Sequence, residues 1–237
     1  MSLIRTAMIM AAGFGTRMGE LTRDLPKPLL PLGGMTLIDH ALSHVRDAGI
    51  GSAVINLHYR GDQIREYLAG RETPRISFSV EHPEILDTGG GIVQALPVLG
   101  PNPFAVLNSD AVFHGPNPLR ALMGSWDAER MDALMLMVPV TSARAYTRAG
   151  DFLLSHSGAV PERRGAAKTA PYVYSGAQII RPEVFAEAPS GPFSTNLIWD
   201  ALLERGRLRA VAYDGEWVDV GTPDGLREAQ TVIAEKV

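Results

Sequence analysis

The chain has 237 residues, a formal net charge of -4 and charged residues at 20% of its positions, and it contains no cysteine. This length fits one large α/β domain, or one domain with a small attached lobe. The absence of cysteine excludes a disulfide framework, a thiolate metal site and a cysteine nucleophile. No dense run of Lys and Arg, the pattern typical of nucleic-acid binders, is present.

The N-terminal segment contains one short apolar run, Ala7–Ala12, which ends at Gly13. So short a run can neither span a membrane nor form the core of a signal peptide. We therefore expect a cytoplasmic protein with no membrane partner and no nucleic-acid partner. The sequence leaves the oligomeric state open between a monomer and a dimer.

Apolar runs bounded by Gly, Pro, Asn or Asp predict buried strands in the first part of the chain. These are Ala7–Ala12, Ser52–Asn56, Ile76–Val80, Phe104–Asn108 and Ala133–Val138. Helical patterns lie at 37–45, 63–68 and 91–99. Strands that alternate with helices in this way predict a mostly parallel sheet covered on both faces.

The last third of the chain has a different pattern. It predicts strands at 151–154 and 171–180, a helix at 195–205 and an amphipathic helix at 224–235. Two short strands, 209–213 and 217–220, flank Asp214-Gly215, a dipeptide typical of hairpin turns. No Pro- or Ser-rich linker separates the two halves, so we expect one continuous domain over residues 1–237.

A glycine-rich turn, A-A-G-F-G-T-R at 11–17, follows the first predicted strand. Backbone N–H groups in such a turn can approach phosphates because glycine has no Cβ. The turn is not a dinucleotide-binding fingerprint, because its third glycine comes one position late and the second strand ends at Asn56 rather than at an acid. No Walker A sequence occurs. Arg17 in the turn and Lys27 between two prolines supply positive charges that suit phosphate oxygens.

The sequence G-x-G-T-R at 13–17, followed by P-K-P-L at 26–29, resembles the signature of the sugar-phosphate nucleotidyltransferases, and the resemblance covers essentially the whole chain. It implies a Rossmann-like mixed α/β sheet sandwiched by helices, the nucleotide-diphospho-sugar transferase fold. It also implies that a nucleoside triphosphate and a sugar 1-phosphate react to give a nucleotide sugar and pyrophosphate. About residues 1–140 would bind the nucleotide, and about 141–237 would bind the sugar and close the site.

Two aspartates lie at or in short apolar strands. Asp110 follows the predicted strand 104–108, and Asp219 lies in the W-V-D-V-G-T segment at 217–222. Either residue alone could be a turn cap or a structural hydrogen-bond acceptor. The resemblance implies instead that both bind one Mg²⁺, a cation usually held by one or two carboxylates and by substrate phosphates.

The segment L-D-T-G-G-G-I at 86–92 bears on the substrate. From the glycines alone, it is either a flexible loop before a helix or a source of free backbone amides for a base and ribose. It is similar to the D/E-T-G-G-G-I run of the N-acetylmuramate 1-phosphate uridylyltransferases, which implies UTP and that sugar phosphate as substrates. The segment at 193–200 departs from this branch. A mannose- or heptose-1-phosphate guanylyltransferase and a non-catalytic nucleotide-sugar sensor are the alternatives.

The resemblance assigns each candidate residue a role. The nucleotide contacts are Ala11, Ala12, Gly13, Gly15, Thr16, Arg17, Lys27, Gly89 and Gly90, the sugar contacts are Asn108, Asp151, Ser175, Gly176 and Asn196, and the catalytic residues are Arg17, Lys27, Asp110 and Asp219. A sugar phosphate is anionic at neutral pH, so no protein base is expected. The cations at 163, 164 and 168 indicate either a contact to substrate phosphate or, more simply, a solvated loop.

Overall fold

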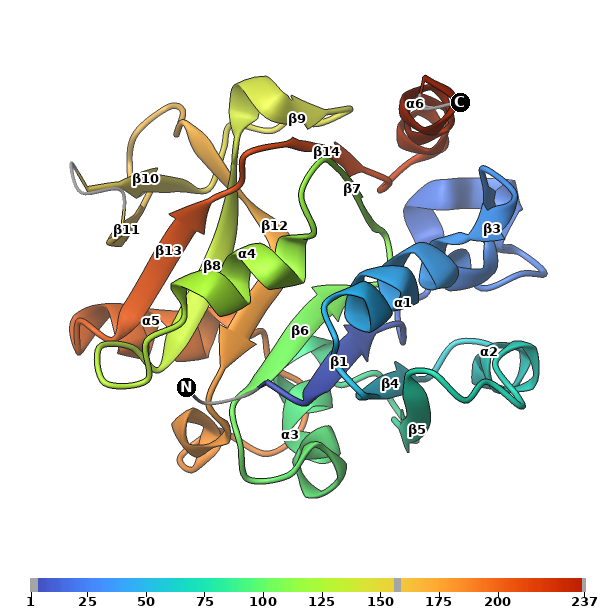
Figure 1. Ribbon diagram of the computed structural model, residues 1–237, viewed down its shortest axis with the longest axis horizontal. Coiled ribbons are helices and arrows are strands. Elements are labelled where there is room, and N and C mark those ends of the chain that lie inside the picture. Colours follow the sequence, from blue (N-terminus) through green and yellow to red (C-terminus); the bar gives the residue numbers. More distant parts are fainter. Residues whose placement is uncertain (1–3, 156–158, 236–237) are drawn as a thin grey trace.

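A computed structural model describes residues 4–155 and 159–235 (Figure 1). The strands are β1 (Thr6–Met10), β2 (Pro31–Leu32), β3 (Met35–Thr36), β4 (Ser52–Leu57), β5 (Arg75–Val80), β6 (Phe104–Asn108), β7 (Ala111–His114), β8 (Ala133–Pro139), β9 (Ala143–Arg144), β10 (Phe152–Leu154), β11 (Pro161–Arg163), β12 (Tyr172–Ile180), β13 (Leu208–Ala212) and β14 (Glu216–Asp219). The α-helices are α1 (Leu37–Asp47), α2 (Gly61–Tyr67), α3 (Asp87–Leu99), α4 (Pro118–Ser125), α5 (Asn196–Glu204) and α6 (Pro223–Ala234). The 3₁₀ helices are η1 (Thr16–Thr22), η2 (Lys27–Leu29), η3 (Val140–Ser142) and η4 (Pro182–Phe185).

One mixed sheet, of nine strands among the described residues, runs through the molecule (Figure 1). Its order is β11-β10-β12-β6-β1-β4-β5, with β8 paired to β12 and β13 paired to β8. Strands β6, β1, β4 and β5 are parallel, whereas β12 is antiparallel to both β6 and β8. The predicted Rossmann-like mixed sheet is therefore confirmed.

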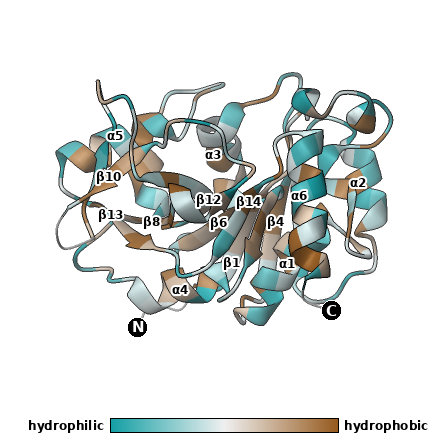
Figure 2. Ribbon diagram, turned by 90° about the horizontal axis from the view of Figure 1, so that it is seen from above, coloured by the Kyte–Doolittle hydropathy of each residue, from teal (hydrophilic) through white to brown (hydrophobic). Residues whose placement is uncertain are grey.

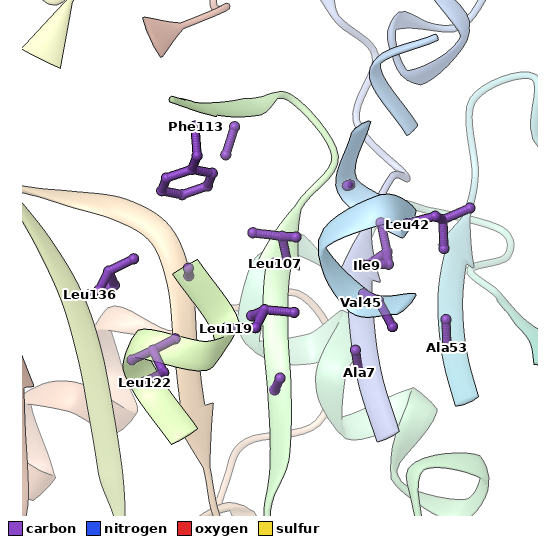
Figure 3. Close-up of a cluster of buried hydrophobic side chains, with 14 of the residues drawn as sticks. Ala7, Ile9, Leu42, Val45, Ala53, Leu107, Phe113, Leu119, Leu122 and Leu136 are labelled. Atoms are coloured by element: carbon purple, nitrogen blue, oxygen red, sulfur yellow. The ribbon is translucent and has the colours of Figure 1, made fainter. Parts of the chain in front are cut away.

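Helices cover both faces of this sheet (Figure 2). The helices α1 and α4 pack on one face, and α3 and α5 pack on the other. Side chains of β1 alternate between the faces, as a strand requires. Ile9 therefore lies in the cluster that contains Leu42 of α1 (Figure 3), and Met8 lies in the cluster that contains Ile92 of α3.

The predicted helices are present within a few residues of their expected ends, and α4 is an addition. Its start has a local signal, since Asn117 accepts hydrogen bonds from the Leu119 and Arg120 backbone N–H groups and Pro118 occupies the first turn. No helix in the described parts of the chain is both long and apolar enough to cross a bilayer.

The predicted hairpin at Asp214-Gly215 is wrong. In the described structure β13 pairs in parallel with β8, and β14 pairs with β7 and β9 of a separate small sheet. Leu208 of β13, a strand of the main sheet, is buried in the cluster that contains side chains of α5, and Val218 of β14 is buried in the cluster that contains side chains of α6. The two side chains lie in different hydrophobic clusters. The free energy gained by burying both is larger than the preference of Asp214-Gly215 for a hairpin turn.

Candidate active site

Two adjoining cavities open along the carboxyl ends of the parallel strands, the edge at which open α/β sheets bind ligands. The smaller cavity has a volume of about 310 Å³ and the larger of about 560 Å³. Arg17, Asn108 and Asp110 line both. The two cavities therefore meet at a point with one cation, one amide and one carboxylate.

The glycine turn after β1 walls the smaller cavity. Ala11, Ala12, Gly13, Gly15, Thr16, Arg17 and Lys27 all line it. Gly15 has a φ of 66°, and a Cβ there would lie 3.1 Å from both Lys27 Cβ and Thr22 Cγ2. The Thr22 hydroxyl donates to the Gly15 carbonyl at 3.0 Å and so closes the turn. Glycine at this position meets both a backbone requirement and a close approach.

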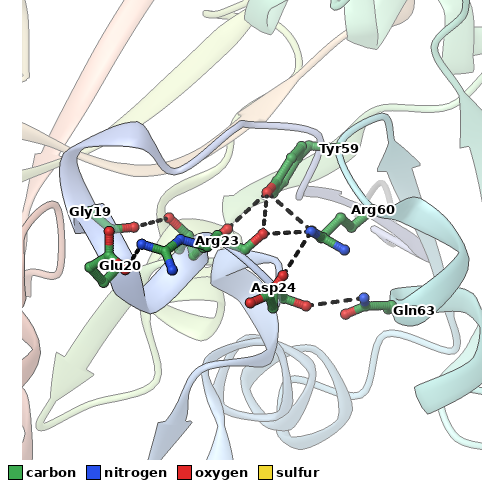
Figure 4. Close-up of polar contacts among 8 residues, drawn as sticks. Gly19, Glu20, Arg23, Asp24, Tyr59, Arg60 and Gln63 are labelled. Carbon is green, nitrogen blue, oxygen red and sulfur yellow. Dashed lines mark hydrogen bonds and ion pairs between the residues drawn. The ribbon is translucent and has the colours of Figure 1, made fainter.

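The segment that follows this turn, 22–24, is anchored to residues before and within α2 (Figure 4). The Tyr59 hydroxyl donates to the Thr22 carbonyl at 2.9 Å. Arg60 donates to the Arg23 carbonyl at 2.5 Å, and Gln63 donates to the Asp24 carbonyl at 3.1 Å. These bonds hold the segment after the turn in place and leave the backbone N–H groups of Gly13, Gly15 and Thr16 out of the contact.

Lys27 and Asp110 form an ion pair. The Lys27 side chain is only 9% exposed, because η2 and its flanking prolines hold the backbone against the protein. A buried ammonium is costly without a partner. Lys27 Nζ is therefore fixed at the junction of the cavities.

Asp219 reaches the same junction through strand pairing. In the β7–β14 ladder Asp219 lies opposite Ala111, the residue after Asp110. Asp219 also accepts a 3.2 Å hydrogen bond from Arg148. A Cβ at Gly221 would lie 2.7 Å from Arg17 Nη1 and 3.0 Å from Asp219 Oδ1, so the absence of a side chain at this position leaves room for both groups.

The start of α3 differs from the sequence expectation. Gly89 and Gly90 lie inside the first turns of the helix, and their N–H groups donate to the Phe193 carbonyl at 2.8 and 3.2 Å. The prediction that these amides are free for a base and ribose is therefore wrong, and neither residue is among those that line the two cavities. Close packing explains the glycines, since a Cβ at Gly89 would lie 2.3 Å from the Phe193 ring.

The residues predicted to contact the sugar all line the larger cavity. They differ in whether their side chains already hydrogen-bond to the protein. Asn108 makes no side-chain hydrogen bond among the described residues, and a Cβ at Gly176 would lie 2.7 Å from its Nδ2. Ser175 donates its hydroxyl to the Leu136 carbonyl at 2.8 Å, and Asp151 accepts from the Tyr174 N–H at 3.2 Å. Asn108 is thus the free amide, whereas Ser175 and Asp151 already serve the fold.

Arg163 ties β11 to the start of α5. Its Nη1 donates to Asn196 Oδ1 at 2.9 Å, its Nε donates to Asp200 at 2.8 Å, and its guanidinium lies 4.8 Å from the Phe152 ring centre. The simpler interpretation of 163–168 as a solvated loop is therefore wrong for this residue. Lys168 is exposed, as that interpretation predicts.

Comparison with known proteins agrees with this arrangement. The nucleotidyl transferase family matches residues 6–236. The chain belongs to this family. A transferase of this kind needs a place for a triphosphate beside a second substrate, and the two adjoining cavities offer it.

The transferase is 40% identical over 237 residues to the N-acetylmuramate alpha-1-phosphate uridylyltransferase of Caulobacter vibrioides, covering 98% of each chain. It is 35% identical over 230 residues to the protein of the same name from Neisseria meningitidis serogroup B, covering 95% of this chain and 97% of the relative. The fold is shared with a UDP-glucose pyrophosphorylase solved with UDP-glucose, with a TM-score of 0.83, 19% identity and coverage of 99% and 100% of the two chains.

Sequence reasoning missed a buried polar network beneath the smaller cavity of the transferase. Asn56 accepts from the Ala11 N–H at 2.7 Å and donates to Glu81 Oε1 at 2.7 Å. Glu81, which is 2% exposed, also accepts from the Leu86 N–H at 2.7 Å. The network joins the ends of β1, β4 and β5 to the start of α3. An acid directly after an apolar strand, the signal used for Asp110, could have identified Glu81.

The donor set at the junction fits a magnesium ion. Asp110 and Asp219 both line the larger cavity, and in this structure their charges are balanced by Lys27 and Arg148. Within 4–155 and 159–235 no cluster of three or more His, Asp or Glu side chains is arranged to hold a metal. Two carboxylates completed by substrate phosphates and water are a common arrangement for Mg²⁺.

Proposed function

We propose that this transferase moves a uridylyl group from UTP to N-acetylmuramate 1-phosphate and releases pyrophosphate. The meeting of two cavities at Arg17 and Asp110 carries the proposal, together with the identity to relatives of that name. The smaller cavity, walled by the glycine turn, holds the nucleotide. The larger holds the sugar. One domain serves both, with about residues 1–140 on the nucleotide side and about 141–237 on the sugar side.

In the proposed reaction an oxygen of the sugar phosphate attacks the α-phosphorus of UTP. The bond from that phosphorus to the bridging oxygen breaks in line with the attack, and pyrophosphate leaves. The attacking phosphate is already ionised at neutral pH, so no side chain has to accept its proton. The protein instead brings two anions together and stabilises the charge on the transferring group.

Arg17 and Lys27 suit this electrostatic role. Arg17 has no carboxylate partner among the described residues, and Lys27 is fixed at the junction by its contact with Asp110. Mg²⁺, held by Asp110, Asp219 and the substrate phosphates, would supply further positive charge at the α-phosphate. The backbone of Gly13, Gly15 and Thr16 would cradle the triphosphate.

The proposed substrates also indicate the cellular compartment and the metabolic role of the reaction. Nucleoside triphosphates are cytoplasmic metabolites, and N-acetylmuramate is a sugar of the bacterial cell wall. We therefore propose a cytoplasmic role in the recycling of cell-wall sugar.

The test is pyrophosphate release with Mg²⁺ from UTP, GTP, dTTP, CTP or ATP, each combined with the 1-phosphates of N-acetylmuramate, N-acetylglucosamine, glucose and mannose. Selective turnover of UTP with N-acetylmuramate 1-phosphate is expected. Turnover with GTP and mannose 1-phosphate would agree with the family assignment, but it would contradict the assignment of UTP and N-acetylmuramate 1-phosphate as substrates. Nucleotide binding with no pyrophosphate release in any combination would favour a sensor.

A further inference from the structure

The wall of the larger cavity contributed by β11 and the loop after it carries positive charge. Arg163 and Arg164 both line the cavity there. Strand β8 occupies one edge of β12, so β10 and β6 share the other edge, with β10 paired at Tyr172 and β6 at residues 177–180. Strand β11 pairs with β10 on its far side. The arginine wall and Asp110, which follows β6, therefore line the same larger cavity from that edge of β12.

The two arginines differ in their partners. Arg163 is committed to Asp200 and Asn196. Among the described residues the Arg164 guanidinium donates only to the backbone carbonyls of Ala167 and Lys168, at 3.4 and 3.3 Å, and no carboxylate pairs with it. A guanidinium fork suits a carboxylate, with two parallel hydrogen bonds. Arg164 therefore offers the larger cavity a positive charge that no carboxylate within 4–155 and 159–235 pairs with.

Thr195 and the first residue of α5 also line the larger cavity, together with the two arginines. Thr195 lines the cavity and is 2% exposed, and its hydroxyl has no hydrogen-bond partner in the described structure. A buried polar group without a partner costs free energy, which a ligand can recover. Thr195 precedes the nine-residue helix α5, whose N-terminus favours negative charge. Arg163 holds this helix start against β11 through Asn196.

We propose that this end of the larger cavity receives a carboxylate carried by the sugar, held by Arg164 and by the Thr195 hydroxyl. The inference rests on the proposed function, because it takes the larger cavity as the sugar site. N-acetylmuramate carries such a carboxylate on its lactyl ether, and N-acetylglucosamine lacks it. The phosphate of the sugar cannot be this anion, since the reaction needs it beside Asp110. Arg164 is thus a specificity residue for acidic sugars.

The test compares N-acetylmuramate 1-phosphate with its lactyl primary amide, which has nearly the same shape and no negative charge. For the wild-type enzyme, kcat/KM for the acid should exceed kcat/KM for the amide by about tenfold or more. This is the factor that corresponds to the usual free energy of a hydrogen bond to a charged group. Arg164→Gln should reduce the acid-to-amide ratio to near one, mainly by raising the KM for the acid, and should change kcat/KM for the amide much less. Arg164→Lys should recover part of the ratio. Thr195→Val should reduce it while keeping the side-chain shape.

The matched control is Lys168→Gln, which removes an exposed cation from the same loop outside the cavity lining and should leave the ratio at its wild-type value. The ratio is measured with whichever triphosphate the enzyme accepts, so failure of the UTP assignment does not affect it. Equal use of acid and amide by the wild type would overturn the inference. So would a wild-type ratio in Arg164→Gln, or an equal loss on both substrates.

Discussion

At the scale of single residues, the site is a set of charges that compensate one another. Lys27 neutralises Asp110 and Arg148 neutralises Asp219 in this structure, whereas Arg17 is left without a carboxylate partner among the described residues. This pattern suits substrates that bring their own negative charge. The phosphates need not displace an ion pair to reach Arg17.

Asp110→Asn should lower kcat for pyrophosphate release by at least about a hundredfold, the usual cost of removing one electrostatic contact to a transition state. The asparagine keeps the shape of the side chain but not its charge, so Mg²⁺ should bind more weakly at the site proposed for it. The melting temperature should change by only a few degrees, because an amide oxygen can still accept from Lys27. Steady-state kinetics and thermal unfolding measure the two effects.

The matched control is Asp47→Asn. Asp47 is exposed, pairs with Arg46 and lies outside both cavities, so neither kcat nor stability should change. Near-normal turnover in Asp110→Asn would show that Asp110 is not one of the proposed metal ligands.

At the scale of elements, the helix α3 shows how packing decides what a glycine does. The run at 89–91 could have been a loop that exposes amides, yet it forms the first turns of a buried helix. Phe193, Gly191 and Glu81 lie where the Cβ atoms of this run would be. The glycines therefore bring α3 close to its neighbours.

Gly91→Ala should destabilise the protein by about 1–2 kcal/mol, although alanine normally stabilises a helix by about 1 kcal/mol relative to glycine. Its Cβ would lie 2.6 Å from Glu81 Oε1 and 3.1 Å from Asn56 Nδ2. Strain in that network should also raise the KM for the nucleotide, because Asn56 holds the Ala11 N–H. Urea unfolding and kinetics measure both effects.

Gly124→Ala in α4 is the control, because a Cβ there has nothing within 4 Å. It should be neutral or should stabilise the protein by up to about 1 kcal/mol. Equal stabilisation by both substitutions would show that the contact at Gly91 is not close.

At the scale of the whole molecule, one carboxylate fastens the ends of three neighbouring strands of the sheet, β8, β12 and β13. Asp132, just before β8, accepts hydrogen bonds from Arg207 at 3.1 and 2.9 Å and lies 3.4 Å from Arg181, which follows β12. The Arg207 hydrogen bonds lower the pKa of Asp132 below its ordinary value, against the opposing effect of burial. One carboxylate thus joins the ends of β8, β12 and β13.

Asp132→Asn should lower the free energy of unfolding at pH 7 by about 1 kcal/mol. Because the pKa of Asp132 is lower in the folded state, its contribution is present above the unfolded pKa and is lost as the pH falls through the folded pKa. The wild-type and variant stabilities should therefore converge below about pH 4. Urea unfolding across this range measures the difference, with the exposed Glu72→Gln as control. A difference independent of pH would show that the carboxylate charge is not the cause.

The sequence by itself determined what depends on local pattern. The glycine turn, the Pro-Lys-Pro cation and Asp110 after a buried strand follow from residue type and spacing, and parallel strands bring such ends to one edge of a sheet. Asp219 reaches the same site from β14 of the small sheet. The structure places Arg17, Lys27, Asp110 and Asp219 around the two cavities. It also contains the strand and helix segments that these patterns predict.

Only the tertiary structure decided what depends on partners distant in the chain. Asp214-Gly215 has the local preference of a hairpin, but β13 buries its apolar face beside β8 and β14 beside β7. The amides of Gly89 and Gly90 bond to a carbonyl more than a hundred residues away. Local propensities are worth a few tenths to about 1 kcal/mol, whereas burial of one large apolar side chain is worth about 2 kcal/mol. Where the two compete, the distant contact prevails.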